Sequence, residues 1–240
     1  LGSGLGALAD RIEGAEALSY SDIPGFPVST APGHKGRFVF GTIGDKEVVL
    51  MDGRVHLYEG YTPQQVVMPI RLMRQMGIHT VLLTNASGGI RRDLHAGDLM
   101  LLTDHISSLV PSPLRGENDP ALGVRFPDMR HVYDEDLQRL FRQTAKELDI
   151  PLKSGVYIQL QGPAFETPAE IKMCAALGAD TAIEAQAARH CGLRVAGVSC
   201  ITNLASGLLD CPLTSEEVGE TAAKVAENFQ SLILETVKRM

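Results

Sequence analysis

Apolar segments of strand length alternate with amphipathic helical segments through most of this chain, and this alternation restricts the fold more than any other feature. Buried strands are predicted at T-V-L-L-T-N (80–85), D-L-M-L-L-T-D-H-I (98–106), G-V-Y-I-Q-L (155–160) and L-R-V-A-G-V-S-C-I-T-N (193–203). Strands that alternate with helices form a largely parallel sheet covered on both faces. The sequence therefore predicts an α/β fold with a mixed, largely parallel central β-sheet flanked by helices, in a single domain over 1–240.

Capping residues mark where helices begin. Thr62 is followed by Pro63 and Gln65 in a capping box, and a similar Thr-Pro-x-Glu start recurs at Thr167. Pro69 lies inside the first of these helices and should kink it. Helices are expected over 62–77, 134–148, 167–178, 182–192 and 214–240, a β-hairpin over 37–51, and a long loop over 109–130.

Composition excludes several classes of function. The net charge is −7 with no basic run, which argues against a nucleic-acid or polybasic membrane partner. No apolar stretch approaches the ~20 residues that span a bilayer, and no leader precedes Leu1. The four cysteines lack C-x-x-C spacing, so small buried thiols in a reducing, cytoplasmic compartment are favoured over a metal site or disulfides; they are Cys174, Cys191, Cys200 and Cys211.

Groups able to bind an anion follow several predicted strands, where α/β proteins place their sites. They are Ser3 in G-S-G-L-G, His34 in P-G-H-K-G-R, Arg54 in M-D-G-R-V-H-L-Y-E-G-Y and the backbone N–H of Ala86 in T-N-A-S-G-G. Taken singly, each stretch could instead be a plain turn or a solvated edge strand.

The stretch after Asp52 adds a second expectation. If it continues a strand, Arg54, His56 and Tyr58 alternate onto one face, which then carries a cation, an imidazole and a phenol. Glu166 directly precedes a helix cap and Asn203 ends an apolar strand. Their alternatives are a carboxylate that stabilises the helix dipole and a turn residue. Together these groups indicate a site for phosphate and a polar heterocycle.

Six stretches in this order resemble the trimeric purine nucleoside phosphorylases over nearly the whole chain. They are G-S-G-L-G, P-G-H-K-G-R-F-V-F-G, M-D-G-R-V-H-L-Y-E-G-Y, T-N-A-S-G-G, G-P-A-F-E-T and I-T-N-L-A-S-G. The resemblance implies the nucleoside phosphorylase fold. It also implies phosphorolysis of 6-oxopurine ribo- and deoxyribonucleosides to the free base and the sugar 1-phosphate, in purine salvage.

The resemblance also implies roles for single residues. The residues expected to bind phosphate are Ser3, His34, Arg54, His56 and Ala86, and those expected to bind the base are Phe165, Glu166 and Asn203. The sugar is expected to contact Tyr58 and also Phe126, which comes from a neighbouring subunit of a homotrimer. The residues expected to be catalytic are His56, Glu59 and Asn203. Bound phosphate stabilises an oxocarbenium-like sugar while Asn203 and Glu166 meet the charge on the leaving purine. No metal and no cofactor are implied, since inorganic phosphate is a co-substrate.

One stretch departs from the family pattern. A helix ends at Gly178 and the next is expected from Ala182, which leaves three residues for a strand. Family members carry a segment like V-G-M-S-T between G-A-D-T and A-I-E-A. It supplies a methionine under the ribose and a serine to phosphate. We predict that this segment, between Thr181 and Ala182, and a helix and strand before G-S-G-L-G are missing from the chain.

A second departure and two alternatives stay open. Ser215 stands where the family often has a histidine for the sugar 5′-hydroxyl. A methylthioadenosine-type phosphorylase, which tends to have aspartate at the Asn203 position, is the nearest alternative function. A non-catalytic nucleoside or phosphate sensor becomes the alternative if the deletion is real.

Overall fold

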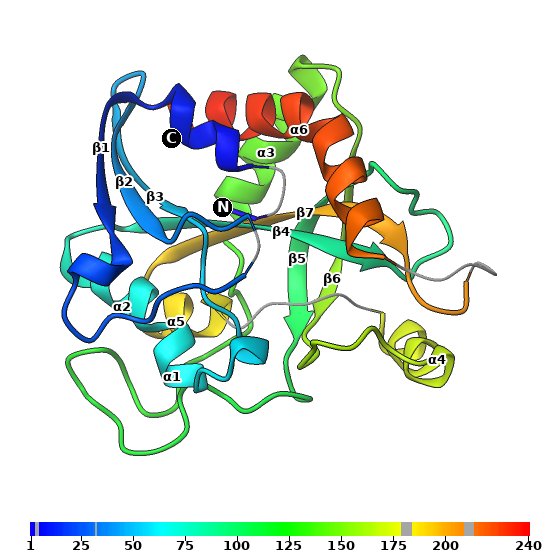
Figure 1. The fold of residues 1–240 in the computed structure, drawn as a ribbon, viewed down its shortest axis with the longest axis horizontal. Helices are drawn as coiled ribbons and strands as arrows, with labels where there is room; N and C mark the ends of the chain where they lie inside the picture. The colour runs from blue at the N-terminus through cyan, green and yellow to red at the C-terminus, as the bar shows by residue number, and fades with distance from the viewer. Residues whose placement is uncertain (3–4, 32, 179–183, 209–213) are drawn as a thin grey trace.

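The computed structural model describes residues 1–2, 5–31, 33–178, 184–208 and 214–240. Figure 1 shows a mixed sheet at the centre, in the strand order β4-β7-β5-β6. β4 is parallel to β7 and β5 to β6, while a short antiparallel ladder joins β5 to β7. The strands are β4 (Thr80–Gly89), β5 (Leu99–Ile106), β6 (Leu152–Ile158) and β7 (Arg194–Leu204). The predicted mixed α/β architecture is confirmed.

A three-stranded antiparallel sheet, in the order β1-β2-β3, stands beside the central sheet. The predicted hairpin is formed by β2 (Arg37–Ile43) and β3 (Lys46–Asp52), with Ile43 opposite Lys46. β1 (Glu13–Ser19) was not predicted. Its sequence E-G-A-E-A-L-S is exposed along nearly its whole length, so it carries no apolar alternation to signal a strand.

The helices match the capping pattern closely. Thr62 accepts a hydrogen bond from the Gln65 N–H, and the helix breaks at Val67, next to the predicted kink at Pro69. Thr167 and Thr214 also cap their helices. The helices are α1 (Pro63–Val66), α2 (Met68–Gln75), α3 (Glu135–Glu147), α4 (Pro168–Leu177), α5 (Glu184–His190) and α6 (Ser215–Lys238), with 3-10 turns η1 (Gly6–Arg11), η2 (Tyr20–Asp22) and η3 (Leu57–Glu59).

Two hydrophobic cores lie on opposite faces of the central sheet. α3 and α6 cover one face, where Phe141 and Leu232 are fully buried against β5 and β7. α2 and α5 lie on the other face, with Ile70 and Ala188 in the second core.

Two local predictions need correction. A turn was the alternative interpretation of T-N-A-S-G-G, and it is wrong, because all six residues belong to β4 and pair with β7. Small residues suit this stretch because another backbone approaches it closely. The segment after Asp52 was expected to continue a strand, but β3 ends at Asp52 and Leu57–Glu59 form the 3-10 turn η3.

Residues 109–130 form the predicted long irregular loop, which extends from the lower edge of the molecule in Figure 1. Cys174, Cys191 and Cys200 are buried, and burial raises the pKa of Cys200 to about 11. Cys211 lies outside the described residues. Within the part of the chain that the structure describes, no helix is long and apolar enough to cross a membrane.

Candidate active site

One cavity of about 570 Å³ opens at the strand ends and collects most of the predicted site residues. Its wall includes His34, Arg54, His56, Tyr58, Ala86, Phe165, Glu166 and Asn203. They come from the loops after β1, β3 and β6 and from the ends of β4 and β7. The sheet thus brings together groups that are up to 169 residues apart in the sequence, from His34 to Asn203.

The start of the chain forms part of the cavity floor. The Gly2 N–H donates to Thr84 Oγ1 at 2.9 Å. A Cβ on Gly2 would lie 2.6 Å from the Asn85 Cα, so only glycine allows this approach to β4. Gly2 lines the cavity, whereas its neighbour Ser3 lies outside the described residues.

Arg54 is held against the end of β4. Its Nη2 donates to the Thr84 carbonyl at 2.8 Å, and its own carbonyl lies 2.9 Å from His34 Nδ1. A carbonyl can only accept, so Nδ1 of His34 carries a proton and Nε2 of the neutral ring is an acceptor. Burial lowers the pKa of His34, and the charge of Arg54 also lowers it. A guanidinium beside a neutral imidazole suits an anion that carries a P–OH group.

Glu59 is buried behind His56 and does not itself line the cavity. One of its oxygens accepts from the His56 N–H at 2.6 Å and lies 2.9 Å from His56 Nδ1. Its other oxygen accepts from the N–H and the hydroxyl of Thr30. Burial alone would raise the pKa of Glu59, but these hydrogen bonds outweigh it and hold the pKa below its usual value. Glu59 therefore stays ionised and holds a proton on His56 Nδ1. This leaves Nε2 on the other side of the His56 ring available to a ligand.

Three neighbouring rings line one wall of the cavity. The His34 and His56 ring centroids are 5.0 Å apart, and the His56 and Tyr58 rings are stacked at 4.7 Å. Tyr58 remains 47% exposed. Burial of the hydroxyl, with the nearby Glu59 charge, raises the pKa of Tyr58. Its phenol is therefore neutral at physiological pH and can donate a hydrogen bond.

The opposite end of the cavity carries Asn203 and the loop 159–167. Asn203 is 5% exposed at the end of β7, and its Oδ1 accepts from Thr202 Oγ1 at 3.0 Å. Glu166 makes no hydrogen bond or ion pair with any described residue. Phe165 beside it is 50% exposed. An apolar ring, a carboxylate and an amide are thus available to a planar polar ligand.

Similarity to known proteins is extensive. Residues 2–238 match the phosphorylase superfamily. Purine nucleoside phosphorylase 1 of Geobacillus stearothermophilus is 47% identical, with 100% of this chain and 89% of the relative covered. A Schistosoma purine nucleoside phosphorylase solved with hypoxanthine superposes with a TM-score of 0.94 at 39% identity, covering 100% of this chain and 89% of the other. The Schistosoma mansoni enzyme solved with adenosine gives 0.93 at 39% identity, covering 100% and 88%.

The chain belongs to the purine nucleoside phosphorylase family. Its relatives are enzymes that transfer pentosyl groups. The family suggested by the six motifs is therefore confirmed. The alignment with the Geobacillus stearothermophilus relative spans 245 residues and takes in all of this chain's 240, so the relative has residues with no counterpart here. The position of the predicted gap, between Thr181 and Ala182, lies outside the described residues.

Polar residues that the sequence interpretation did not assign also line the cavity of this phosphorylase. Asn85 donates to the Tyr157 hydroxyl, and Ser199 Oγ donates to Asn85 Oδ1 at 2.7 Å. This chain of hydrogen bonds fixes the residue that precedes Ala86. The available signal was a polar side chain within an otherwise apolar strand: Asn85 in T-V-L-L-T-N and Tyr157 in G-V-Y-I-Q-L.

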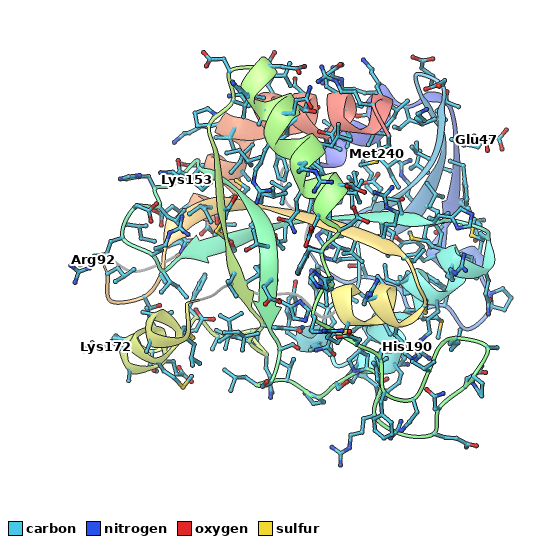
Figure 2. All side chains as sticks on the ribbon, turned by 180° about the vertical axis from the view of Figure 1, so that it is seen from behind. Glu47, Arg92, Lys153, Lys172, His190 and Met240 are labelled. Atoms are coloured by element: carbon cyan, nitrogen blue, oxygen red, sulfur yellow. The ribbon has the colours of Figure 1, made fainter. Side chains whose placement is uncertain are left out.

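Phe126 lies away from the cavity of its own chain, and it is 89% exposed. The loop that carries it is internally bonded. Arg125 Nη1 donates to the Gly116 carbonyl at 2.8 Å, and His190 Nε2, at the end of α5, donates to the Val124 carbonyl at 3.0 Å. Figure 2 shows His190 beside this loop. The structure therefore separates Phe126 from the other predicted site residues while holding its loop in place.

Two further predictions concern the contact at Ser215 and the need for a metal or cofactor. Ser215 begins α6, and Val218 one turn later lines the cavity, but the Ser215 side chain lies outside what the structure describes. Among the described residues, no group of three or more His, Cys, Asp and Glu side chains could hold a metal ion. That the enzyme needs no cofactor stays a prediction.

Proposed function

We propose that this chain catalyses the phosphorolysis of 6-oxopurine nucleosides to the free base and the sugar 1-phosphate. One observation carries the proposal: a single cavity has a guanidinium and two imidazoles at one end and, at the other, a buried amide and a carboxylate that bonds to none of the described residues. The first end suits phosphate and the second suits a purine, so a sugar bridging them would place its C1′ between the two reactants.

At the phosphate end, Arg54 supplies the fixed charge and His34 and His56 supply hydrogen bonds. Ala86 offers its backbone N–H, and the family pattern assigns Ser3 to phosphate as well. Glu59 acts through His56, because it touches the ring rather than the cavity. A charge-assisted contact between a guanidinium and a phosphate is about twice as strong as a neutral hydrogen bond.

At the purine end, Glu166 accepts the N1–H of the base and Asn203 contacts O6 and N7. As the C1′–N9 bond breaks, its electron pair moves onto the purine, and a phosphate oxygen forms the new bond to C1′. Asn203 stabilises the charge that develops on the leaving base, with Phe165 packed near the ring and Tyr58 against the ribose. Rate enhancement then comes from positioning and electrostatics.

Assembly completes the proposed site. Phe126 is exposed on its own chain and remote from its own cavity. We assign it to the sugar pocket of a neighbouring copy in a homotrimer in the cytoplasm. Scattering in solution should show a trimer, and an active monomer would rule out the shared site.

The missing residues belong to the same proposal. A segment between Thr181 and Ala182 would supply further sugar and phosphate contacts, and the longer alignment with the Geobacillus stearothermophilus relative supports its existence. Sequencing the gene across this junction shows whether the natural protein contains the segment. An intact segment is expected, and an uninterrupted junction in a protein without activity would favour the sensor alternative.

Turnover of inosine tests the activity itself. Hypoxanthine and ribose 1-phosphate should appear in equal amounts, and only when phosphate is present. Cleavage at the same rate without phosphate would indicate hydrolysis and overturn the proposal.

Base selectivity tests the assignment of Glu166 and Asn203. Ionised Glu166 can only accept, so it fits the N1–H of a 6-oxopurine and not the bare N1 of adenine. A site built for one hydrogen-bond pattern can reject the analogue that lacks it by ~10⁴ in kcat/KM. We expect this preference for inosine over adenosine, and Asn203→Asp should narrow it. Turnover is measured as well as binding, since a relative has been solved with adenosine. Equal kcat/KM values for the two nucleosides would contradict the assignment.

A further inference from the structure

The wall of the cavity contains two buried polar atoms with no hydrogen-bond partner among the described residues. They are Ser87 Oγ on β4 and Gln159 Oε1 just after β6. Gln159 as a whole is only 7% exposed, although it borders the cavity. Buried polar groups are nearly always paired, and an unpaired one costs ~1–3 kcal/mol, so each such group needs an explanation.

The position of Gln159 in the strand limits what its amide can reach. Its N–H donates to the Ile106 carbonyl at 2.8 Å, which extends the ladder of β6 by one residue. Side chains alternate along a strand, so Gln159 shares a face with Tyr157 and stands about 7 Å further along. Ile158 between them points to the other side, into the cluster with Ile171 and Cys174.

Tyr157 fixes the orientation of this face relative to the two ends of the cavity. Its hydroxyl pairs with Asn85, the residue before Ala86 at the proposed phosphate end. Glu166, at the proposed purine end, follows Gln159 in the loop that leads to α4. Along the chain, Gln159 therefore comes after the residue that is bonded to the proposed phosphate end and before the loop that carries Glu166. If phosphate and purine occupy their assigned positions, the sugar that bridges them is the part of a nucleoside that would face this stretch of the cavity wall.

We propose that Gln159 is a specificity residue whose amide oxygen accepts a hydrogen bond from a ribose hydroxyl of the bound nucleoside. This inference rests on the proposed function, because that function places the sugar beside Gln159. An amide carbonyl is an acceptor, and the 2′- and 3′-hydroxyls are the donors that a ribose offers at its lower edge. The unpaired atom of the free protein is then paired in the complex.

Gln159→Met is the first test, since methionine has a similar length and no strong acceptor. We expect kcat/KM for inosine to fall about 10-fold while the KM for phosphate stays unchanged. Gln143→Met on α3 is the matched control. That glutamine is exposed, and its side chain donates to Glu147 on the same helix. No loss in Gln159→Met, or an equal loss for phosphate, would overturn the proposal.

Thermal unfolding separates a substrate contact from a structural one. Removing an unpaired buried acceptor should leave the Tm of the free protein unchanged or raise it, even though activity falls. A lower Tm that accounts for the lost activity would contradict the proposal.

Deoxy analogues then identify the donor. The loss caused by Gln159→Met should disappear for either 2′-deoxyinosine or 3′-deoxyinosine, because that analogue lacks the hydroxyl in question. The same fold loss for inosine and for both analogues would move the contact to the base and overturn the sugar assignment. If the unmodified enzyme does not turn over inosine, the proposed function fails. Calorimetric affinity for inosine, compared between Gln159→Met and the unmodified protein, still tests Gln159.

Discussion

The two ends of the cavity differ in how completely the free protein has assembled them. At the phosphate end, the Glu59 side chain is 2% exposed and accepts hydrogen bonds from both Thr30 and His56. Arg54 is tied to the Thr84 carbonyl. At the purine end, Phe165 is 50% exposed and Glu166 has no partner among the described residues.

The difference follows from where each group is attached. The phosphate end is built against β4: the Arg54 side chain bonds to the Thr84 carbonyl, and Glu59 ties the segment 54–59 to Thr30. The purine carboxylate stands on a loop between β6 and α4, ahead of the helix cap at Thr167. A preassembled end binds its ligand without ordering cost, whereas a loosely held end is ordered by the ligand or by a neighbouring subunit. Variants at the two ends should therefore behave differently.

Arg54→Ala should have the largest effect. It removes the fixed charge at the assembled end, and truncating a buried, hydrogen-bonded charge costs ~2–5 kcal/mol. We expect kcat/KM for phosphate to fall on the order of 10³-fold, with a smaller change in affinity for hypoxanthine. Arg92→Ala is the control, because this exposed arginine lies at the periphery in Figure 2. An equal loss for both ligands would mean that the two ends are not separate.

Glu59→Ala and Glu166→Ala compare the same substitution at the two ends. Glu59→Ala leaves donors of Thr30 and His56 unpaired and should lower the free energy of unfolding by about 3 kcal/mol. Glu166→Ala removes a side chain that bonds to none of the described residues and should change the free energy of unfolding by less than about 0.5 kcal/mol. Chemical denaturation of both variants measures the two changes in the free energy of unfolding. Equal destabilisation by the two substitutions would contradict the difference between the two ends.

The pKa of Glu59 gives this contrast a pH dependence. Because folding lowers that pKa, the stabilisation by ionised Glu59 is present above its ordinary pKa and is lost as the pH falls through the lowered value. The stability difference between the unmodified protein and Glu59→Ala should therefore be constant near neutral pH and shrink only in acid. If the stability difference between the two proteins disappears between pH 6 and 8, a titrating group other than Glu59 causes it.

Glu166→Ala should also weaken catalysis on inosine by about 10–100-fold, since a hydrogen bond to a charged acceptor contributes ~1.5–3 kcal/mol. The effect should appear for inosine and guanosine but not in the KM for phosphate. If Glu166→Ala turns over inosine at the unmodified rate, the carboxylate does not hold N1–H.

Phe126→Ala should have the smallest of these effects, about 10-fold in the KM for inosine, because one ring contact with the sugar is lost. Val124→Ala serves as the control in the same exposed loop. Mixing Phe126→Ala with Arg54→Ala chains should restore part of the activity, since mixed assemblies pair an intact cavity with an intact loop. No gain on mixing would contradict the shared site.

The sequence predicted the helices and the central strands well because caps and apolar periodicity are local signals. Thr62, Thr167 and Thr214 each cap a helix as expected. β1 escaped prediction because its stability comes from pairing with β2 and not from its own pattern. A turn remained an alternative for T-N-A-S-G-G because its small residues are typical of turns, whereas tertiary pairing with β7 keeps the segment extended.

The site shows the same division. Motif residues such as Arg54 and Asn203 could be named from the sequence, since the family pattern marks them. The residues that hold the site residues in place could not be named from the sequence. Thr30 bonds to Glu59, and Ser199 bonds to Asn85, through tertiary contacts between segments far apart in the chain. Gln159 stood in the quoted strand G-V-Y-I-Q-L, but its unpaired buried oxygen is visible only in three dimensions.

The central claim is that the free protein already has an assembled phosphate end. Titration of phosphate into the protein without nucleoside tests it most directly, because an assembled end should bind phosphate when no nucleoside is present. Calorimetry should show saturable phosphate binding to the unmodified protein and to Glu166→Ala, and none to Arg54→Ala at the same concentrations. Phosphate binding that appears only after a nucleoside or base is added would contradict the account.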